Sequence, residues 1–293
     1  MNHGFWRDVW SRAPTWPDQD PMVLKTMRFE HNVTGRNFDR NRRDALVTER
    51  LTKSTWILNG YGFCGNTGVS EYAGGGDISA AIWKKSPLNP DYRIAIDMTT
   101  REQLIIGVQA AIGLAELHTF DDKDRPSVAH TDITPGQFVK VNDRFKLNDF
   151  NRARFIRVSK NHSLCSFAIS KNPGKNRSPE EYTRHALLSE KIDLYSLGNI
   201  FYMLLQKQWP FQEENTKEAQ RMVKHGYRPS FYEDVWNSTD PYTVALKTAM
   251  LRCHQQDPRD RPTASELAYF LKQKLDGLEP GLIASWGEPF ASR

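Results

Sequence analysis

Three charged residues stand in short segments whose chemistry suits a phosphate group. Asp132 lies within residues 130–137, HTDITPGQ, and Asp149 opens the triplet DFN, twelve residues after Gln137. A hard cation such as Mg²⁺ prefers carboxylate oxygen, which makes Asp149 a candidate metal ligand. Phosphoryl transfer needs mainly positioning and charge neutralisation, which a second carboxylate and a lysine such as Lys25 could supply.

The order and spacing of these segments resemble the protein kinase family. Residues 130–137 resemble the catalytic loop HRDLKPxN, residues 149–151 resemble DFG, and residues 178–180, SPE, stand where APE closes an activation segment. Each triplet alone is common by chance, whereas their order and spacing together are specific. Residues 193–198, DLYSLG, and residues 257–263, DPRDRPT, resemble DxWSxG and DPxxRPT of the same family.

The first part of the chain carries matches to nucleotide-binding segments of the family. Residues 23–25, VLK, resemble VAIK, whose lysine clamps the α- and β-phosphates of ATP. Residues 70–73, SEYA, resemble the hinge that holds adenine through backbone groups, with Ser70 as a small gatekeeper.

The nucleotide lid is the least complete match. Gly4, Arg7 and Val9 fit the second glycine, third glycine and valine of GxGxxGxV, and Lys25 follows Val9 by 16 residues. The first glycine would fall at Asn2, so either the chain is truncated or the lid is abbreviated. The resemblance extends from position 4 to about position 275, nearly the whole chain.

The resemblance implies a role for each of these residues. Asp132 would accept or orient the proton of the substrate hydroxyl, Lys25 would serve catalysis by binding phosphate, and Asp149 and Gln137 would hold Mg²⁺. The nucleotide-binding set that it implies is Gly4, Val9, Val23, Lys25, Ser70, Glu71, Ala73 and Val139.

A second set of residues is expected to hold the site together. Counting back from Ile57 places Asp44 as the ion-pair partner of Lys25, with one inserted residue, and Glu49 is the alternative. Aspartate is one methylene shorter than the usual glutamate, so this pair would need a closer helix.

The resemblance also implies contacts within the larger lobe. Arg261 would form a buried ion pair with Glu180, and breaking such a pair would cost roughly 3–5 kcal/mol. His130 and Phe150 would pack in a hydrophobic column between the lobes, while Asp193 would accept hydrogen bonds from the catalytic-loop backbone.

Several positions depart from the family pattern. Gln137 replaces the asparagine that holds a second Mg²⁺ but keeps an amide oxygen, and Asn151 replaces the glycine of DFG, where asparagine tolerates left-handed backbone angles. Thr134 replaces the lysine typical of serine/threonine kinases. A tyrosine kinase would carry arginine at Gly136, so serine/threonine specificity is favoured.

The activation segment lacks its usual phosphate anchor. Thr131 stands where an arginine usually pairs with an activation-loop phosphate, so we expect that phosphorylation is not the main switch. A different phosphate anchor is also compatible with the sequence. The segment contains Ser159, Ser163, Ser166 and Ser170 as phosphate acceptors, and Lys160 and Lys171 beside them as cations.

Three functions are compatible with these patterns. The favoured one is an active kinase that transfers the ATP γ-phosphate to a protein hydroxyl, because Lys25, Asp132 and Asp149 are all retained. The substitutions leave open a pseudokinase that acts as a scaffold or allosteric partner. A small-molecule phosphotransferase of related fold fits less well, because the SPE triplet and Arg261 point to the protein kinase branch.

The elements predicted from periodicity agree with a bilobal α+β fold. Strands are expected at 23–27 and 68–72, and helices at 38–53, 101–118, 192–206 and 263–274. We expect one domain over residues 1–293. It would comprise an abbreviated β-rich N-lobe with one main helix (1–73), a mostly helical C-lobe (74–275) and a C-terminal tail (276–293).

Composition narrows the setting of this chain. The formal charge is +5, but Lys and Arg are scattered among nearly as many acids, so nucleic-acid binding is not expected. No run of 18 apolar residues occurs, which argues against membrane insertion. The chain has three cysteines, an odd number, at Cys64, Cys165 and Cys253. They are widely spaced, match no zinc-binding spacing, and favour an intracellular, cytoplasmic location.

Overall fold

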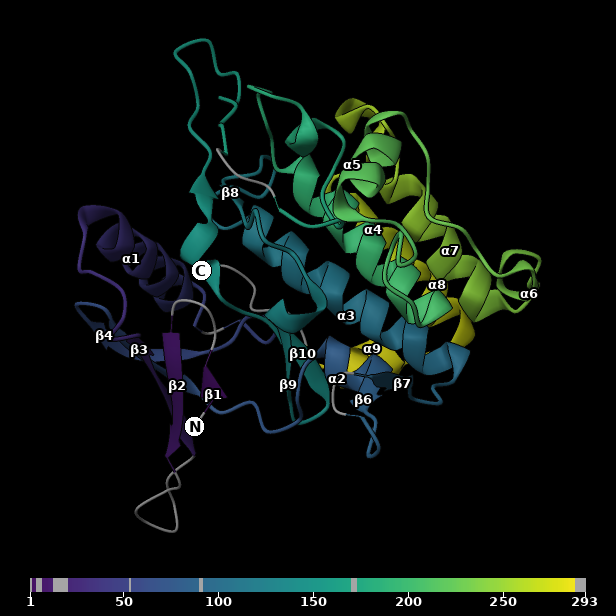
Figure 1. Cartoon of the computed structure of the whole chain (residues 1–293), viewed down its shortest axis with the longest axis horizontal. Helices are drawn as coiled ribbons and strands as arrows, with labels where there is room; N and C mark the ends of the chain where they lie inside the picture. Colours follow the sequence, from purple (N-terminus) through teal and green to yellow (C-terminus); the bar gives the residue numbers. More distant parts are fainter. Residues whose placement is uncertain are drawn as a thin grey trace.

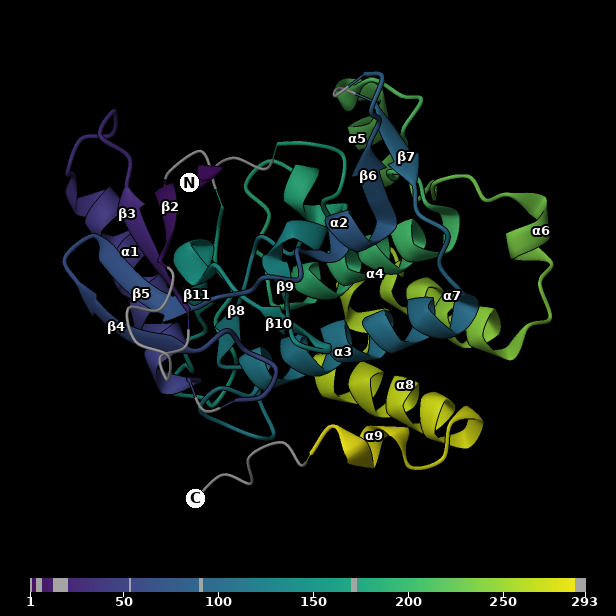
Figure 2. The ribbon, with the colours of Figure 1, turned by 90° about the horizontal axis from the view of Figure 1, so that it is seen from below.

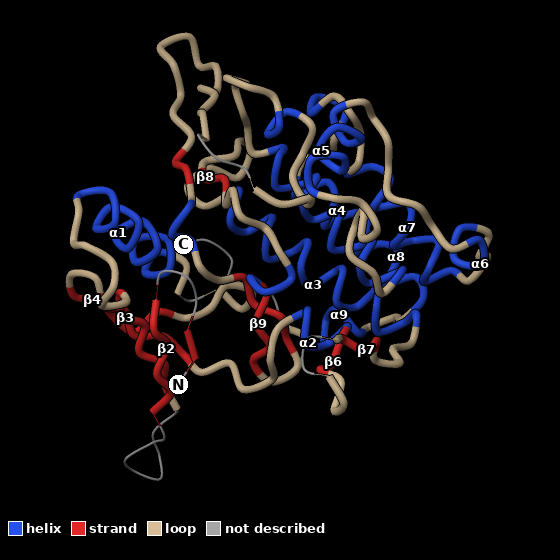
Figure 3. The backbone as a smooth tube through the Cα atoms, viewed as in Figure 1, coloured by secondary structure: helices blue, strands red, loops and turns tan. Residues whose placement is uncertain are grey.

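The computed structural model describes residues 2–3, 7–12, 21–52, 54–89, 92–169 and 173–287. They form a small sheet-rich N-terminal part and a larger helical C-terminal part, so the predicted α+β class with two lobes is confirmed. The strands of the small part and the helices of the large part lie on opposite sides of the molecule (Figures 1 and 3).

The small part is one antiparallel sheet with one long helix. Its elements are β1 (Asn2–His3), β2 (Arg7–Arg12), β3 (Met22–Met27), α1 (Gly35–Arg50), β4 (Gly60–Cys64) and β5 (Thr67–Glu71). The strand order is β1-β2-β3-β5-β4, and β3 and β5 correspond to the two predicted strands. Helix α1 begins before the expected position 38, because the Thr34 side chain caps it by accepting a hydrogen bond from the Asn37 backbone at 3.2 Å.

The large part contains most of the helices. They are α2 (Ile78–Ile82), α3 (Thr100–His118), α4 (Lys191–Gln206), α5 (Thr216–Lys224), α6 (Glu233–Trp236), α7 (Pro241–Cys253), α8 (Ala264–Leu278) and α9 (Leu282–Ser285). Short 3₁₀ turns are η1 (Pro135–Gln137), η2 (Phe150–Arg152), η3 (Glu180–Tyr182) and η4 (Pro258–Asp260). None of the helices in the described part of the chain has the length and apolarity that crossing a lipid bilayer requires.

Three short two-stranded ladders complete the described residues of the large part. These strands are β6 (Trp83–Lys85) with β7 (Arg93–Ala95), β8 (Val128–Ala129) with β11 (Arg154–Phe155), and β9 (Phe138–Val141) with β10 (Arg144–Leu147). The β8–β11 and β9–β10 ladders flank the two loops that carry Asp132 and Asp149. They fix the ends of both loops against α3 (Figure 2).

The main hydrophobic core lies among α3, α4, α7 and α8. Leu104, Leu197, Leu246 and Leu271, one from each helix, are fully buried. Helix α8 starts with a capping box, in which the Thr263 side chain accepts from the Glu266 backbone and the Glu266 side chain accepts from the Thr263 backbone. The long helices therefore form a rigid base for the loops above them.

The segment after α1 ties the two parts together. Trp56 and Ile57 are almost completely buried, and the backbone of Ile57 pairs in parallel with Leu147 of β10. The Trp56 ring meets Trp286 edge-on, with ring centres 5.6 Å apart. Because Trp286 is buried, the described residues after position 275 pack on the large part through α8 and α9 (Figure 2).

Candidate active site

The loop that carries Asp132 is held by a buried carboxylate. Asp193, in α4, accepts hydrogen bonds from the backbone N–H groups of His130 at 2.6 Å and Thr131 at 2.8 Å. Thr131 has φ of 64°, which is unusual for a β-branched residue, and its hydroxyl donates to the carbonyl of Arg152 at 2.9 Å. The expected hydrogen bonds to Asp193 thus hold a turn that would otherwise relax.

Asp132 is bound by two arginines that the sequence motifs did not indicate. Arg177 Nη2 donates to Asp132 Oδ1, and Arg152 Nη1 lies 3.5 Å from the same oxygen. Arg177 also donates to the Thr131 carbonyl at 3.0 Å and lies 3.9 Å from Glu181. Burial alone raises the pKa of Asp132, but Arg177 and Arg152 outweigh it and hold this pKa below its ordinary value. Asp132 is therefore a carboxylate fixed in place.

The sequence did contain an indirect signal for such a partner. A largely buried carboxylate needs a cation nearby, and the positions that carry one in related kinases are here Thr134 and Gly136. Because neither Thr134 nor Gly136 carries a positive charge, another basic residue was needed beside Asp132. Nothing in the one-dimensional pattern singled out Arg177, which precedes the SPE triplet.

His130 and Phe150 are fully buried and pack against each other, with ring centres 5.5 Å apart. The backbone N–H of Asp132 donates to His130 Nδ1 at 3.2 Å, so the imidazole accepts at this atom. The same ring donates through Nε2 to the carbonyl of Asn148 at 3.1 Å. These contacts support the packing role assigned to both residues.

Asp149 occupies a strained backbone position at the start of η2. Its φ and ψ are 63° and 67°, the left-handed region, and the side-chain amide of Asn151 donates to its Oδ1. Asn151 could tolerate left-handed backbone angles but is not among the residues with positive φ, and Asp149 adopts the left-handed conformation instead. Asn151 instead supports the neighbouring carboxylate.

Lys25 does not pair with Asp44, which corrects the expected ion pair. Lys25 Nζ donates to Asn148 Oδ1 at 2.6 Å, while Asp44 Oδ2 lies 2.5 Å from Arg7 Nη1. The second oxygen of Asp44 accepts the backbone N–H of Phe150 at 2.6 Å. Both oxygens of this short side chain are thus engaged elsewhere. Burial lowers the pKa of Lys25, an effect that Asp44 and Asp149 partly offset.

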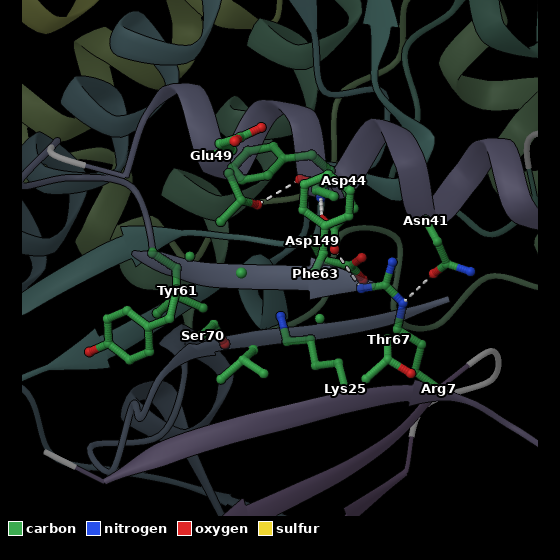
Figure 4. A pocket seen from close by; sticks show the side chains of 18 of the residues that line it. Arg7, Lys25, Asn41, Asp44, Glu49, Tyr61, Phe63, Thr67, Ser70 and Asp149 are labelled. Carbon is green, nitrogen blue, oxygen red and sulfur yellow. Dashed lines mark hydrogen bonds and ion pairs between the residues drawn. The ribbon is translucent and has the colours of Figure 1, made fainter. Parts of the chain in front are cut away.

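Lys25 and Asp149 line one cavity of about 320 Å³ (Figure 4). It lies between α1 and the β4–β5 hairpin, and three other members of the predicted site, Asp44, Ser70 and Phe150, also line it. The alternative partner Glu49 also lines it but makes no ion pair within the described residues. Asp132 does not line this cavity, and Arg152 interacts electrostatically with both Asp132 and Asp149.

The sheet brings several predicted nucleotide-binding residues together beside this cavity. Val9 lies directly opposite Lys25 in the β2–β3 ladder, so both side chains share one face of the sheet, together with Val23 two residues away. Gly4 lies outside the described residues. The cavity itself is bordered by α1, and its lining does not include Val9, Val23, Glu71, Ala73 or Val139.

The hinge segment offers backbone groups to a ligand. The Glu71 side chain turns away from Lys25, accepting from Asn59 N at 2.6 Å and from Lys146 Nζ at 2.7 Å. The Ala73 N–H makes no backbone hydrogen bond within the described residues. The buried Ser70 hydroxyl also has no hydrogen-bond partner there. These polar groups fit the recognition of a base.

The donors near Asp149 fit one Mg²⁺ shared with a phosphate. No group of three His, Cys, Asp or Glu residues in the described ranges could hold a metal alone. Gln137 closes η1, where its carbonyl accepts from Asn148 N at 2.9 Å, and its side-chain amide has no hydrogen bond among the described residues. Mg²⁺ is commonly held by one or two protein oxygens together with substrate phosphates, which matches Asp149 and Gln137.

The long-range ion pair expected in the large part is present. Arg261 Nη1 and Nη2 donate to the two carboxylate oxygens of Glu180 at 2.6 and 2.9 Å. The Arg261 side chain is fully buried and that of Glu180 is 15% exposed. This bidentate pair fixes the end of the activation segment to the turn η4 before α8.

Comparison with known proteins identifies one family. A sequence model described as protein kinase domain matches residues 14–270. The serine/threonine-protein kinase VIK of Arabidopsis thaliana is 25% identical over 198 residues, 67% of this chain. Receptor-interacting serine/threonine-protein kinase 4 of Homo sapiens is 26% identical over 77% of the chain. The probable serine/threonine-protein kinase gdt2 of Dictyostelium discoideum is 23% identical over 92% of it. The matches span 40%, 26% and 15% of these three proteins.

Proposed function

Because the chain belongs to the protein kinase family, we propose that it transfers the γ-phosphoryl group of ATP to a serine or threonine hydroxyl of a protein. Members of this family generally use ATP and Mg²⁺. The observation that carries the proposal is the convergence of Lys25 and Asp149 on one cavity. Asp132 lies outside the cavity lining, and Arg152 interacts electrostatically with both Asp132 and Asp149.

The chain's own residues would divide the work as follows. Lys25 neutralises phosphate charge, and Asp149 and Gln137 hold Mg²⁺, which supplies further charge neutralisation when bound. Adenine is held by backbone groups of Glu71 and Ala73. The apolar surface around the base comes from Val9, Val23 and Val139, with Ser70 behind it and Gly4 in the lid.

Asp132 orients the substrate hydroxyl more than it removes its proton. Arg177 and Arg152 hold the pKa of this carboxyl below its ordinary value, so it binds a proton weakly. A fixed carboxylate can still accept a hydrogen bond from the hydroxyl and align its oxygen for attack. Such positioning is the main demand of phosphoryl transfer.

A pseudokinase that binds ATP or a partner without transferring phosphate is the second candidate. Two observations favour the pseudokinase. Lys25 forms no ion pair with Asp44, which pairs with Arg7 instead, and Asp132 already forms an ion pair with Arg177. Against it stands the retention of Lys25, Asp132 and Asp149, which a scaffold does not require.

We further propose that residues 1–293 act as one kinase domain, with the division into 1–73, 74–275 and 276–293 given above. Cys64, Cys165 and Cys253 are free thiols. This agrees with a reducing intracellular compartment such as the cytoplasm, where ATP is the available phosphate donor.

A thermal-shift titration with ATP and Mg²⁺, run beside a phosphate-transfer assay on a generic protein substrate, tests the proposal. A ligand that binds only the folded state raises the unfolding temperature with its concentration. A shift together with transfer is expected. A shift without transfer favours the pseudokinase, and no shift with Mg²⁺ and ATP contradicts nucleotide binding.

A further inference from the structure

A cation of strand β2 connects the sheet to helix α1 across the cavity. Arg7 Nη1 lies 2.5 Å from Asp44 Oδ2, and Arg7 Nε donates to Asn41 Oδ1 at 3.1 Å (Figure 4). Asn41 and Asp44 are three residues apart on α1 and therefore share one face of the helix. One guanidinium thus binds two neighbouring side chains of the same helical turn.

Arg7 and Lys25 start from the same face of the sheet but have different partners. Val9 lies opposite Lys25 and Arg7 lies opposite Met27 in the β2–β3 ladder, so both cations project from one face. Figure 4 shows both side chains directed from the sheet toward α1. Lys25 stops at Asn148, whereas the longer Arg7 reaches the helix.

The contact continues from α1 to the segment of Asp149. Asp44 Oδ1 accepts the backbone N–H of Phe150, the residue after Asp149, at 2.6 Å. Arg7 and Asp44 are 12% and 14% exposed, so solvent screens this pair weakly. Burial alone raises the pKa of Asp44, and Arg7, followed by Lys25, reverses this and holds it below its ordinary value.

We propose that Arg7 is the positioning residue that anchors α1 and, through Asp44, the Asp149 segment, which leaves Lys25 to the phosphates of ATP. The role of Lys25 in this division rests on the proposed function. The anchoring role of Arg7 does not, because it concerns the protein without nucleotide. Removing the Arg7 charge strands a largely buried carboxylate, and the helix and the loop that share Asp44 should loosen together.

Hydrogen exchange of the full chain without nucleotide tests the anchor. Arg7→Gln keeps a polar side chain but removes the charge, and we expect exchange in α1 and in residues 149–152 to rise about tenfold or more. Lys25→Gln should leave both segments within about twofold of the parent. Arg50→Gln is the matched control, because it breaks the exposed pair of α1 with Asp121 and should leave the rest of α1 unchanged.

The double variant Arg7→Gln with Asp44→Asn keeps the test decisive if Arg7→Gln alone fails to fold. It leaves no stranded charge, and we expect it to fold and to show the same loosened α1. Equal protection of α1 in this variant and in the parent would overturn the proposal. So would loosening by Lys25→Gln with none by Arg7→Gln.

Kinetics with ATP then separate the two cations. Arg7→Gln should lower kcat more than it raises KM for ATP, and Arg7→Lys should restore part of the loss because it can still pair with Asp44. Lys25→Gln should mainly weaken ATP binding. If the parent neither binds ATP nor transfers phosphate, the proposed function fails, while hydrogen exchange still decides the role of Arg7. A larger kcat effect at Lys25 than at Arg7 would overturn the division of roles.

Discussion

The large helical part and the small sheet-rich part hold their charged groups in different ways. In the large part, Glu180 pairs with Arg261 and Asp193 binds the catalytic-loop backbone, both as the motifs predicted. In the small part, the expected Lys25–Asp44 pair is replaced by an Arg7–Asp44 pair. The same family pattern is thus followed in one part and rearranged in the other.

Packing accounts for this difference. The large part has a continuous core among α3, α4, α7 and α8, which fixes side chains far apart in sequence. In the described small part, the β4–β5 hairpin carries Gly60, Gly62, Gly65 and Gly68 along one side of the cavity, where apolar side chains could otherwise pack. The partners of the charged groups in the small part are therefore determined by side-chain length and strand register rather than by a continuous core.

The largest effect is expected from breaking the buried pair of the large part. Arg261→Ala strands the carboxylate of Glu180 and should lower the free energy of unfolding by roughly 3–5 kcal/mol, measured by urea denaturation. Arg259→Ala, two residues away, removes an exposed ion pair with Asp257 and should cause no measurable change. Equal effects of the two variants would contradict the contrast between buried and exposed pairs.

Asp132→Asn should abolish function while keeping the fold. The neutral amide is a weaker hydrogen-bond acceptor for the hydroxyl than a carboxylate and cannot take up its proton, so phosphate transfer should fall by about 10²–10⁴-fold, while the ATP-induced thermal shift remains. Asp143→Asn alters an exposed residue and should transfer phosphate at the parental rate. Full activity of Asp132→Asn would remove Asp132 from the reaction.

Glu181 of the large part should make the stability of the protein depend on pH. Burial raises the pKa of Glu181 to about 7, although Arg177 opposes this. Its folded pKa lies above the unfolded value of 4.5, so its stabilisation is complete below about pH 4.5 and is lost as pH rises through 7.

Glu181→Gln isolates this contribution. The stability of the parent relative to this variant should fall by about 1–3 kcal/mol between about pH 4.5 and pH 8, measured from urea midpoints. A difference that is independent of pH would show that Glu181 is not protonated in the folded state.

The smallest effect is expected in the activation segment. The Thr131 hydroxyl donates a hydrogen bond to the Arg152 carbonyl, and threonine cannot form the charged bidentate contact with a phosphate that arginine forms. Replacing Ser159, Ser163, Ser166 and Ser170 with alanine should therefore keep phosphate transfer within a few-fold of the parent. Ser170 and Lys171 lie outside the described residues.

A hundredfold loss, reproduced by phosphatase treatment of the parent, would contradict this and show a phosphate switch. The anchor would then be sought near Arg154. Burial, together with Arg43 and Arg152, lowers the pKa of Arg154 to about 10, and this marks a concentration of positive charge.

The sequence predicted the fold and the large-part contacts well, for a physical reason. Helix α3, helix α4 and the capping box at Thr263 follow from local periodicity and capping, and Glu180 and Arg261 belong to motifs of fixed order. These features depend on residues whose spacing along the chain determines their spacing in the fold.

The small-part partners could not be read in the same way. Whether Lys25 or Arg7 reaches Asp44 depends on side-chain length and on the β2–β3 register, which place both cations on one face. Arg177 lies near the end of the activation segment, and it reaches Asp132 because of the path that this segment takes in three dimensions. Sequence indicated that charges were missing at Thr134 and Gly136, but only the three-dimensional structure identified the arginines that replace them.

Phosphate transfer from radiolabelled ATP to a generic protein substrate, followed by identification of the labelled amino acid, tests the central claim most directly. The parent should label serine or threonine only when Mg²⁺ is present, and Asp149→Asn should lose this labelling because the metal ligand is gone. Labelling of tyrosine would contradict the proposed specificity. Equal labelling by the parent and Asp149→Asn, or none by the parent, would contradict the proposal that this chain is an active kinase.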